Sequence, residues 1–156
     1  MLDTDGDGAS SRHDYFVRIE RTRLATARGH DDPLVVAART TGEHAWAATD
    51  ADGNGVMTSE DYVAWVDADK FDNVCRHALG TLFDPTDADQ DGALDRSQFT
   101  APRRALDNRA DNADAALDAP HGDGDGRVSR AQHLTSIRAY VTGDHSPIGD
   151  ALHRRP

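Results

Sequence analysis

The sequence predicts an all-α protein in which four helix–loop–helix units associate in two pairs to form one compact bundle. Three observations lead to this prediction. A short acidic segment that ends in glycine occurs four times, apolar residues follow each glycine at similar distances, and the segments between carry apolar residues at helical spacing. A chain of 156 residues with 37% apolar composition is long enough to bury such a core.

The acidic segments set the register of the repeat. They read DTDGDG, DADGNG, DADQDG and HGDGDG, and their last residues are Gly8, Gly55, Gly92 and Gly126. A single acidic turn is common on a solvated surface, whereas several in register within one chain indicate a shared structural role. The segments open four loops of equal length, which span residues 3–14, 50–61, 87–98 and 121–132.

The segments between the loops predict helices. One apolar helical face is formed by Phe71, Val74, Cys75, Ala78, Leu79, Leu82 and Phe83. Another helix is expected from Leu34 to Trp46, with Pro33 in its first turn and Gly29 closing the helix before it. This helix accounts for the 47 residues between the first two glycines of the repeat. Trp46 and Trp65 are expected to be core residues.

The repeat divides the chain into three parts. An N-terminal pair of units, a C-terminal pair and a short tail that caps the bundle are expected over residues 1–67, 68–145 and 146–156. Only Met1 and Leu2 precede Asp3, so no entering helix of the first unit is expected within this sequence. Either the natural chain starts further upstream, or the first unit is a half-hand of reduced affinity.

The composition argues against several classes of function. The formal net charge of -11 makes nucleic acid an unexpected partner, because phosphate binding needs clustered Lys and Arg. Cys75 is the only cysteine, which excludes an internal disulfide and favours a cytoplasmic location; we expect it to be a buried packing residue. No stretch approaches the ~20 apolar residues of a membrane helix, so no membrane association is expected. No nucleophile paired with a base can be argued, and we expect no enzymatic activity.

The loops have the oxygen pattern that a hard divalent cation requires. Calcium takes six to eight oxygen ligands, and a tight loop supplies them from side chains at positions 1, 3, 5 and 12, from the carbonyl of position 7 and, through water, from position 9. Position 6 is glycine because the chain turns sharply there. On these residues the chain resembles the EF-hand family of calcium-binding proteins, and the resemblance covers nearly the whole sequence.

Loops one and two match the EF-hand pattern best. Loop one (residues 3–14) offers Asp3, Asp5, Asp7, the carbonyl of Ala9, and Asp14. Loop two (residues 50–61) offers Asp50, Asp52, Asn54, the carbonyl of Val56, and Asp61. We predict that loop two is the best site of the chain. Both loops end in Asp where the family has Glu, so lower calcium affinity and competition by magnesium are predicted.

Loops three and four depart further from the pattern. Loop three (residues 87–98) offers Asp87, Asp89, Asp91, the carbonyl of Ala93, and Gln98. The neutral amide of Gln98 predicts a weak site. Loop four (residues 121–132) has His121 and Gln132 at its first and last positions, and is predicted to be structural because imidazole is a poor ligand for a hard cation. Two bound calcium ions are therefore predicted, and a third if loop three fills.

The long first interval and the degenerate fourth loop resemble the bacterial, calerythrin-like relatives of the sarcoplasmic calcium-binding proteins. This resemblance implies an intracellular calcium buffer or calcium-responsive regulator, which we expect to be a monomer. A calmodulin-like sensor with one dedicated protein partner is an alternative, although Met1 and Met57 are too few for a Met-rich groove. A dockerin-like interaction module is a second alternative. Loops that end in Asp favour it, and the long helices between the loops oppose it.

Overall fold

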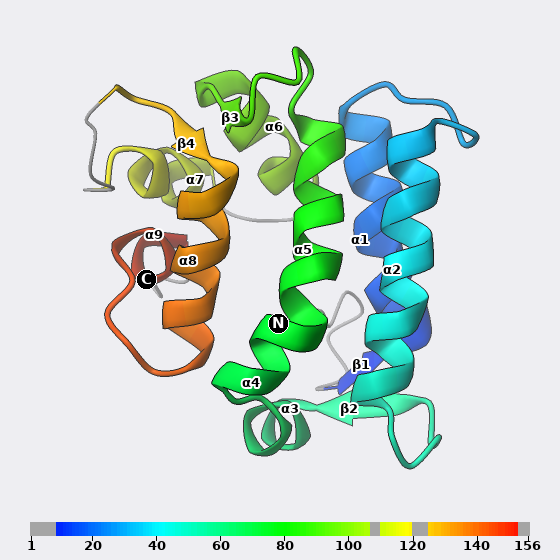
Figure 1. Ribbon diagram of the computed structural model, residues 1–156. Coiled ribbons are helices and arrows are strands. Elements are labelled where there is room, and N and C mark those ends of the chain that lie inside the picture. The colour runs from blue at the N-terminus through cyan, green and yellow to red at the C-terminus, as the bar shows by residue number, and fades with distance from the viewer. Residues whose placement is uncertain (1–8, 107–109, 120–124, 153–156) are drawn as a thin grey trace.

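Most of the chain that the structure describes is helical (Figure 1). The computed structural model describes residues 9–106, 110–119 and 125–152. Its α-helices are α1 (Arg12–Ala25), α2 (Pro33–Thr49), α3 (Ser59–Trp65), α4 (Ala68–Lys70), α5 (Arg76–Phe83), α6 (Arg96–Ala105), α7 (Ala110–Leu117), α8 (Arg130–Val141) and α9 (Pro147–Leu152). A π-helical segment, η1 (Phe71–Cys75), joins α4 to α5, and a 3₁₀ turn, η2 (Asp84–Thr86), follows α5. The predicted all-α class is confirmed.

The helix after each loop begins with the same reciprocal capping arrangement. The side chain of the N-cap residue accepts a hydrogen bond from the backbone N–H three residues later, and the side chain of that later residue accepts one from the N-cap N–H. The N-cap residues are Ser11, Thr58, Asp95 and Ser129, and their partners are Asp14, Asp61, Gln98 and Gln132. These are positions 9 and 12 of the loops, so the loop pattern itself fixes where α1, α3, α6 and α8 begin.

Helix α2 begins as the sequence predicts and continues to Thr49. Asp32 caps its first turn, and Pro33 occupies the first helical position, where no backbone donor is needed. The prediction that Gly29 closes the preceding helix is wrong. Helix α1 ends at Ala25, and Ala27 takes the left-handed conformation with φ of 53°. The chain therefore turns two residues before the glycine is reached.

The apolar face predicted between loops two and three lies on one helical run formed by α4, η1 and α5. Phe71, Cys75, Ala78 and Phe83 are buried along this run. The π-helical turn of η1 places an additional residue in one turn, and the spacing of the apolar residues did not indicate it. Ala78 belongs to one hydrophobic core and Phe83 to another, so α5 connects the two halves of the molecule.

The loops pair through short antiparallel strands. Strand β1 (Ala9–Ser11) pairs with β2 (Val56–Thr58), and β3 (Ala93–Leu94) pairs with β4 (Val128–Ser129). In both pairs the eighth residues of the two loops lie opposite each other. Figure 1 shows the two strand pairs at opposite ends of the molecule. Loops one and two therefore meet at one end, and loops three and four at the other.

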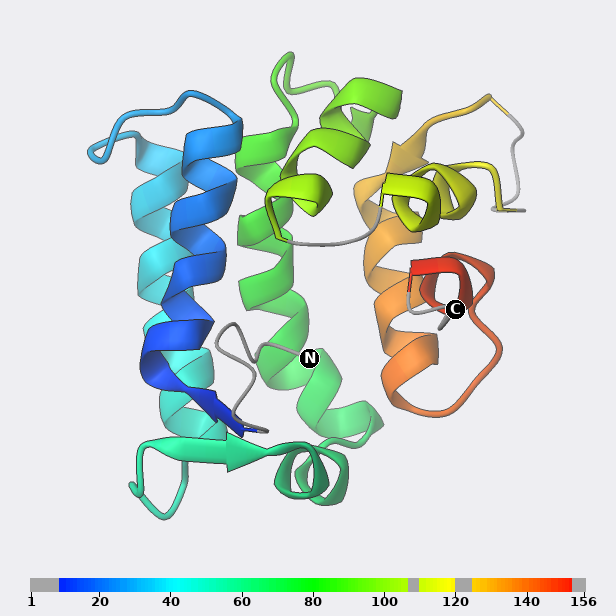
Figure 2. The ribbon, with the colours of Figure 1, turned by 180° about the vertical axis from the view of Figure 1, so that it is seen from behind.

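Each strand pair is backed by its own hydrophobic core. The core behind β1 and β2 contains Tyr15, Ala45, Trp46, Met57 and Ala78. The core behind β3 and β4 contains Phe83, Leu94, Phe99, Ala116, Leu117, Val128, Ile148 and Ala151. The last two residues come from α9, which contacts α7 and α8 (Figure 2). The short tail helix thus completes the second core.

The two tryptophans occupy different environments. Trp46 is 5% exposed and packs against the Tyr15 ring, as predicted for a core residue. Trp65 is only half-buried, with the Tyr62 ring on one side and the Lys70 ammonium 5.5 Å from its ring centroid. Its prediction as a core residue is wrong, because α3 ends at Trp65 and leaves the ring at the edge of the bundle. Among the described residues, no helix combines the length and the apolar character needed to cross a bilayer.

Candidate metal centres

Loop three gathers three carboxylates around one point. Asp87, Asp89 and Asp91 each place a carboxylate oxygen within 4.8 Å of the other two. They stand at positions 1, 3 and 5 of the loop, the positions expected to supply side-chain ligands. Within the described part of the chain, no other His, Cys, Asp or Glu residues form a group of three at this spacing. Like charges at such distances repel, so the arrangement favours a cation among them.

Asp87 anchors this cluster. It follows the turn η2, and only 6% of its surface is exposed. Its Oδ2 accepts a hydrogen bond from the Gly92 N–H at 2.8 Å, whereas its Oδ1 is buried without a hydrogen-bond partner. Buried carboxylate oxygens are almost always paired, because losing hydration is costly for a charged group. An unpartnered oxygen beside two further carboxylates fits a divalent cation.

The backbone of loops two and three turns at two positions rather than one. The position-6 residues Gly55 and Gly92 have φ of 77° and 86°, as the sequence pattern requires. The position-4 residues Gly53 and Gln90 are also left-handed, with φ of 68° and 57°. Only the glycine at position 6 was recognised from the sequence. Gln90 adopts a conformation that costs a residue with a Cβ roughly 1–2 kcal/mol.

The closing residue of loop three has its oxygen already engaged. Gln98 Oε1 accepts a hydrogen bond from the Asp95 N–H at 2.9 Å, which completes the capping of α6. Its amide nitrogen, Nε2, donates to Asp89 Oδ1 at 3.1 Å. Gln98 therefore lies within reach of the cluster, as position 12 should, but it presents a donor to a ligand rather than a second negative oxygen.

An arginine from loop four also reaches loop three. Arg127 Nη2 donates to both carboxylate oxygens of Asp91, at 2.8 and 2.6 Å, and to the Ala93 carbonyl at 2.8 Å. The guanidinium holds the pKa of Asp91 below its ordinary value, with a further contribution from the Ala93 N–H. No sequence pattern points to Arg127. Its contact with Asp91 joins residues 36 apart in the sequence and depends on the pairing of β3 with β4.

Loop two has the same backbone but a different arrangement of side chains. Both carboxylate oxygens of Asp50 accept from the Gly55 N–H at 3.2 Å, the equivalent of the bond between Asp87 and Gly92. Asp52 Oδ2 accepts from Asn54 Nδ2 at 2.9 Å, and Asn54 Oδ1 accepts from the Val56 N–H at 2.8 Å. Positions 3 and 5 are therefore bonded to each other and to the loop backbone. The carboxylates of loop two do not form a group of the kind seen in loop three.

Asp61 closes loop two and caps α3 at the same time. Its Oδ2 accepts from the Thr58 N–H at 3.0 Å and from the Thr58 hydroxyl at 2.7 Å. These bonds, the hydroxyl first, lower the pKa of Asp61 from its ordinary value. Asp61 is therefore held as a carboxylate at the edge of the loop. The ranking of loop two above loop three rests on ligand identity and stays a prediction.

Loop one is described only in its second half. Asp3, Asp5 and Asp7 lie outside the described residues. Ala9 begins β1, and Asp14 is 2% exposed, with Oδ2 accepting from the Ser11 N–H at 2.9 Å and from the Ser11 hydroxyl at 2.6 Å. The position-7 and position-12 residues thus lie where the EF-hand pattern requires them.

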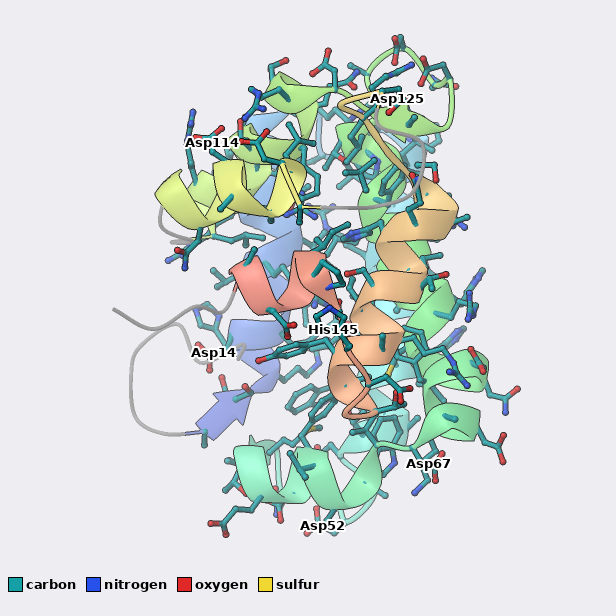
Figure 3. All side chains as sticks on the ribbon, turned by 90° about the vertical axis from the view of Figure 1, so that its left-hand side faces the viewer. Asp14, Asp52, Asp67, Asp114, Asp125 and His145 are labelled. Atoms are coloured by element: carbon teal, nitrogen blue, oxygen red, sulfur yellow. The ribbon has the colours of Figure 1, made fainter. Side chains whose placement is uncertain are left out.

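Loop four is described only from Asp125 onward, and its prediction as a structural loop stays a prediction. His121 lies outside the described residues. Asp125 Oδ1 accepts from the Arg127 N–H at 2.8 Å, and Gln132 Oε1 accepts from the Ser129 N–H at 2.7 Å, capping α8. In Figure 3, Asp52 of loop two and Asp125 of loop four lie at opposite ends of the molecule. The two pairs of loops are therefore separate centres.

The fold is similar to that of several solved calcium-binding proteins. A calcium-binding protein of Streptomyces coelicolor is 24% identical with a TM-score of 0.75, and the match covers 92% of this chain and 93% of that one. Mitrocomin, a calcium-regulated photoprotein of the jellyfish Mitrocoma cellularia, is 13% identical with a TM-score of 0.75, covering 97% and 84%. The coelenterazine-binding protein of Renilla muelleri is 19% identical with a TM-score of 0.63, covering 96% and 87%.

No protein-family model matches the sequence, and a search of curated proteins finds no match either. The assignment of the fold therefore rests on the structural similarities. Together with the paired loops and the left-handed glycine at position 6, they show that the chain has the EF-hand fold of these calcium-binding proteins.

Proposed function

We propose that this protein binds calcium through its EF-hand loops and acts as an intracellular calcium buffer or calcium-responsive regulator without catalytic activity. The observation that carries the proposal is the cluster of Asp87, Asp89 and Asp91, in which one buried carboxylate oxygen has no hydrogen-bond partner. Hard oxygen ligands at this density suit calcium or magnesium better than any softer metal. The carboxylates are thereby accounted for as ligands rather than as acid–base catalysts.

The proposed stoichiometry is two ions, in loops one and two, and a third if loop three fills. Loop three has the tightest cluster of carboxylates in the described residues, and loop two has the more complete set of ligand types. Asp at position 12 reaches less far than Glu, so we expect calcium affinity to be modest and magnesium to compete.

A buffer is favoured over a calmodulin-like sensor with one dedicated partner. A sensor of that type exposes a groove rich in methionine, whereas Met57 is 9% exposed and packed in the first core. Within the described ranges, the exposed large apolar residues are spread over different helices and one strand; they are Leu24, Val36, Val56, Val63 and Tyr140. The Streptomyces protein is associated with calcium-mediated regulation, which supports the regulator as the alternative role.

Calorimetric calcium titration tests the proposal, with and without millimolar magnesium. The variants are Asp61→Asn in loop two and Asp14→Asn in loop one, and the matched control is Asp67→Asn, which makes the same change at the N-cap of α4, outside every loop. Each loop variant should lose one ion from the stoichiometry or bind it at least about tenfold more weakly, because a negative ligand becomes neutral. The control should match the wild type.

Two results would contradict the proposal. The first is the absence of any calcium-binding heat in the wild type. The second is an unchanged stoichiometry and affinity in Asp61→Asn, which would remove loop two from the ligand set. A parallel titration with a dye for apolar surfaces distinguishes the roles, since a sensor should bind more dye when calcium is added and a buffer should not.

A further inference from the structure

Arg127 occupies two ligand groups of the neighbouring loop. It stands at position 7 of loop four, directly before β4, and its guanidinium bonds to Asp91 and to the Ala93 carbonyl of loop three. These are positions 5 and 7 of loop three, both of which belong to the expected coordination shell. Among the ion pairs of the described residues, Asp91 pairs with Arg127 alone, and neither Asp87 nor Asp89 has a cationic partner.

Calcium and the guanidinium need the same oxygens. A calcium ion would have to lie about 2.3–2.6 Å from the Asp91 carboxylate and from the Ala93 carbonyl. The Arg127 nitrogen lies 2.6 to 2.8 Å from these same atoms. Two cations cannot share the position, because they would repel each other strongly at such a distance. Binding of the ion therefore requires the guanidinium to leave.

The rest of loop three remains open to an ion. Asp87 is 6% exposed and keeps an unpartnered Oδ1, and it lies with Asp89 in the same carboxylate group as Asp91. Arg127 thus pairs with the Asp91 carboxylate and leaves Asp87 Oδ1 without a hydrogen-bond partner.

We propose that Arg127 is a built-in competitor for the loop-three cation site, so that loop four sets the calcium affinity of its partner loop although it lacks a full ligand set of its own. The inference rests on the proposed function, because it concerns calcium at loop three. It assigns to loop four a role beyond packing against loop three, and it makes release of the Arg127 side chain an obligatory part of calcium binding.

The test follows loops two and three separately in one NMR titration at buffered free calcium. The amide signals of Gly55 and Gly92 report the two loops, because each N–H donates to the position-1 aspartate of its own loop. The test variants are Arg127→Gln, which removes the positive charge, and Arg127→Lys, which keeps the charge but lacks the planar guanidinium that can donate several hydrogen bonds. The matched control is Arg76→Gln. Arg76 pairs with Asp72 at 2.6 Å and is the first residue of α5, whereas loop three follows the other end of that helix.

In Arg127→Gln the calcium affinity reported by Gly92 should rise about fivefold, which is what loss of a partly exposed, charge-assisted pair would give. The affinity reported by Gly55 should stay at the wild-type value. In Arg127→Lys, the calcium affinity reported by Gly92 should lie between the values of the wild type and of Arg127→Gln. Arg76→Gln should leave the affinities reported by both glycines unchanged, because salt screens charges beyond ~8 Å. In the wild type, the Arg127 side-chain NH signals should shift together with the Gly92 signal.

An equal or weaker affinity at Gly92 in Arg127→Gln would overturn the inference. So would a Gly92 signal that fails to respond to calcium in both proteins while the Gly55 signal responds. If neither glycine responded in any variant, the proposed calcium binding itself would fail, and the two failures are therefore distinguishable. Because Arg127 is about one-third exposed and lies outside both hydrophobic cores, the variants should fold.

Discussion

The residue at position 12 serves two purposes in each loop. It caps the following helix by accepting a hydrogen bond from the N-cap N–H, and in the EF-hand pattern it also closes the coordination shell. Asp61 performs the first task with one oxygen, Oδ2. Gln98 performs it with the only oxygen of its side chain, which is a second reason, besides the loss of charge, to expect a weak site in loop three.

Gln98→Glu should raise the calcium affinity of loop three by about tenfold. The substitution adds a negative oxygen where Nε2 now donates to Asp89, and affinity in these loops increases with ligand charge. Calorimetry or the Gly92 amide signal would measure the change. Gln132→Glu is the matched control, because it makes the same substitution at position 12 of loop four and should create no site of comparable affinity. Equal gains in both variants would show a general charge effect.

A half-buried histidine makes stability depend on pH. The His133 ring packs against Phe83, and burial, followed by the nearby Arg103 and Arg130, lowers its pKa to about 3. In the unfolded chain the pKa is about 6.5. Between these values the unfolded state binds the proton and the folded state does not, so the free energy of unfolding should decrease as pH falls from about 6.5 toward 3, by up to about 1.4 kcal/mol per pH unit.

His133→Gln should remove this contribution to the pH dependence. Urea denaturation from pH 7 to pH 5, in the presence of a chelator, would measure it, because most carboxylates stay ionised in that range. The exposed His77 offers the control substitution, which should leave the slope at the wild-type value. A wild-type slope in His133→Gln would show that the pKa of the ring is the same in the folded and unfolded states, which would contradict the prediction.

At the scale of elements, the predictable parts are those with a local cause. Helix α2 follows from Asp32 and Pro33, and the start of each helix after a loop follows from positions 9 and 12. The π-helical turn η1 has no signal in the spacing of the apolar residues. The Arg127 contact depends on strand pairing between distant loops. The π-helical turn and the Arg127 contact could therefore be found only in the tertiary structure.

The tail helix α9 should contribute measurably to stability. Ile148 is 4% exposed in the second core, and it packs there with Leu117 and Phe83. Ile148→Ala should reduce the free energy of unfolding by about 2–3 kcal/mol, as expected for a large-to-small change in a core. Urea denaturation in excess calcium would measure it. Val63→Ala is the control, because Val63 is 72% exposed and its truncation should cost less than about 0.5 kcal/mol.

The whole molecule carries its negative charge unevenly. The net charge is -11, and the acidic residues are concentrated in the four loop sequences. Arg127 offsets part of it in loop three, and in loop two Asp50 and Asp61 accept hydrogen bonds from the loop backbone. Two calcium ions would bring the formal charge from -11 to -7. The folded state should therefore depend on calcium more than on salt in general.

Calcium should raise the melting temperature of the protein by about 10–20 °C at a concentration one hundred times the Kd. Each ion that binds only the folded state adds about 2.7 kcal/mol under that condition, and a chain of this size gains roughly 2–4 °C per kcal/mol. Calorimetry with calcium, with a chelator, and with sodium chloride of equal ionic strength separates ligand binding from screening. Asp61→Asn should lose about half of the calcium effect and keep the sodium effect. An equal rise with sodium would mean that screening, and not coordination, stabilises the bundle.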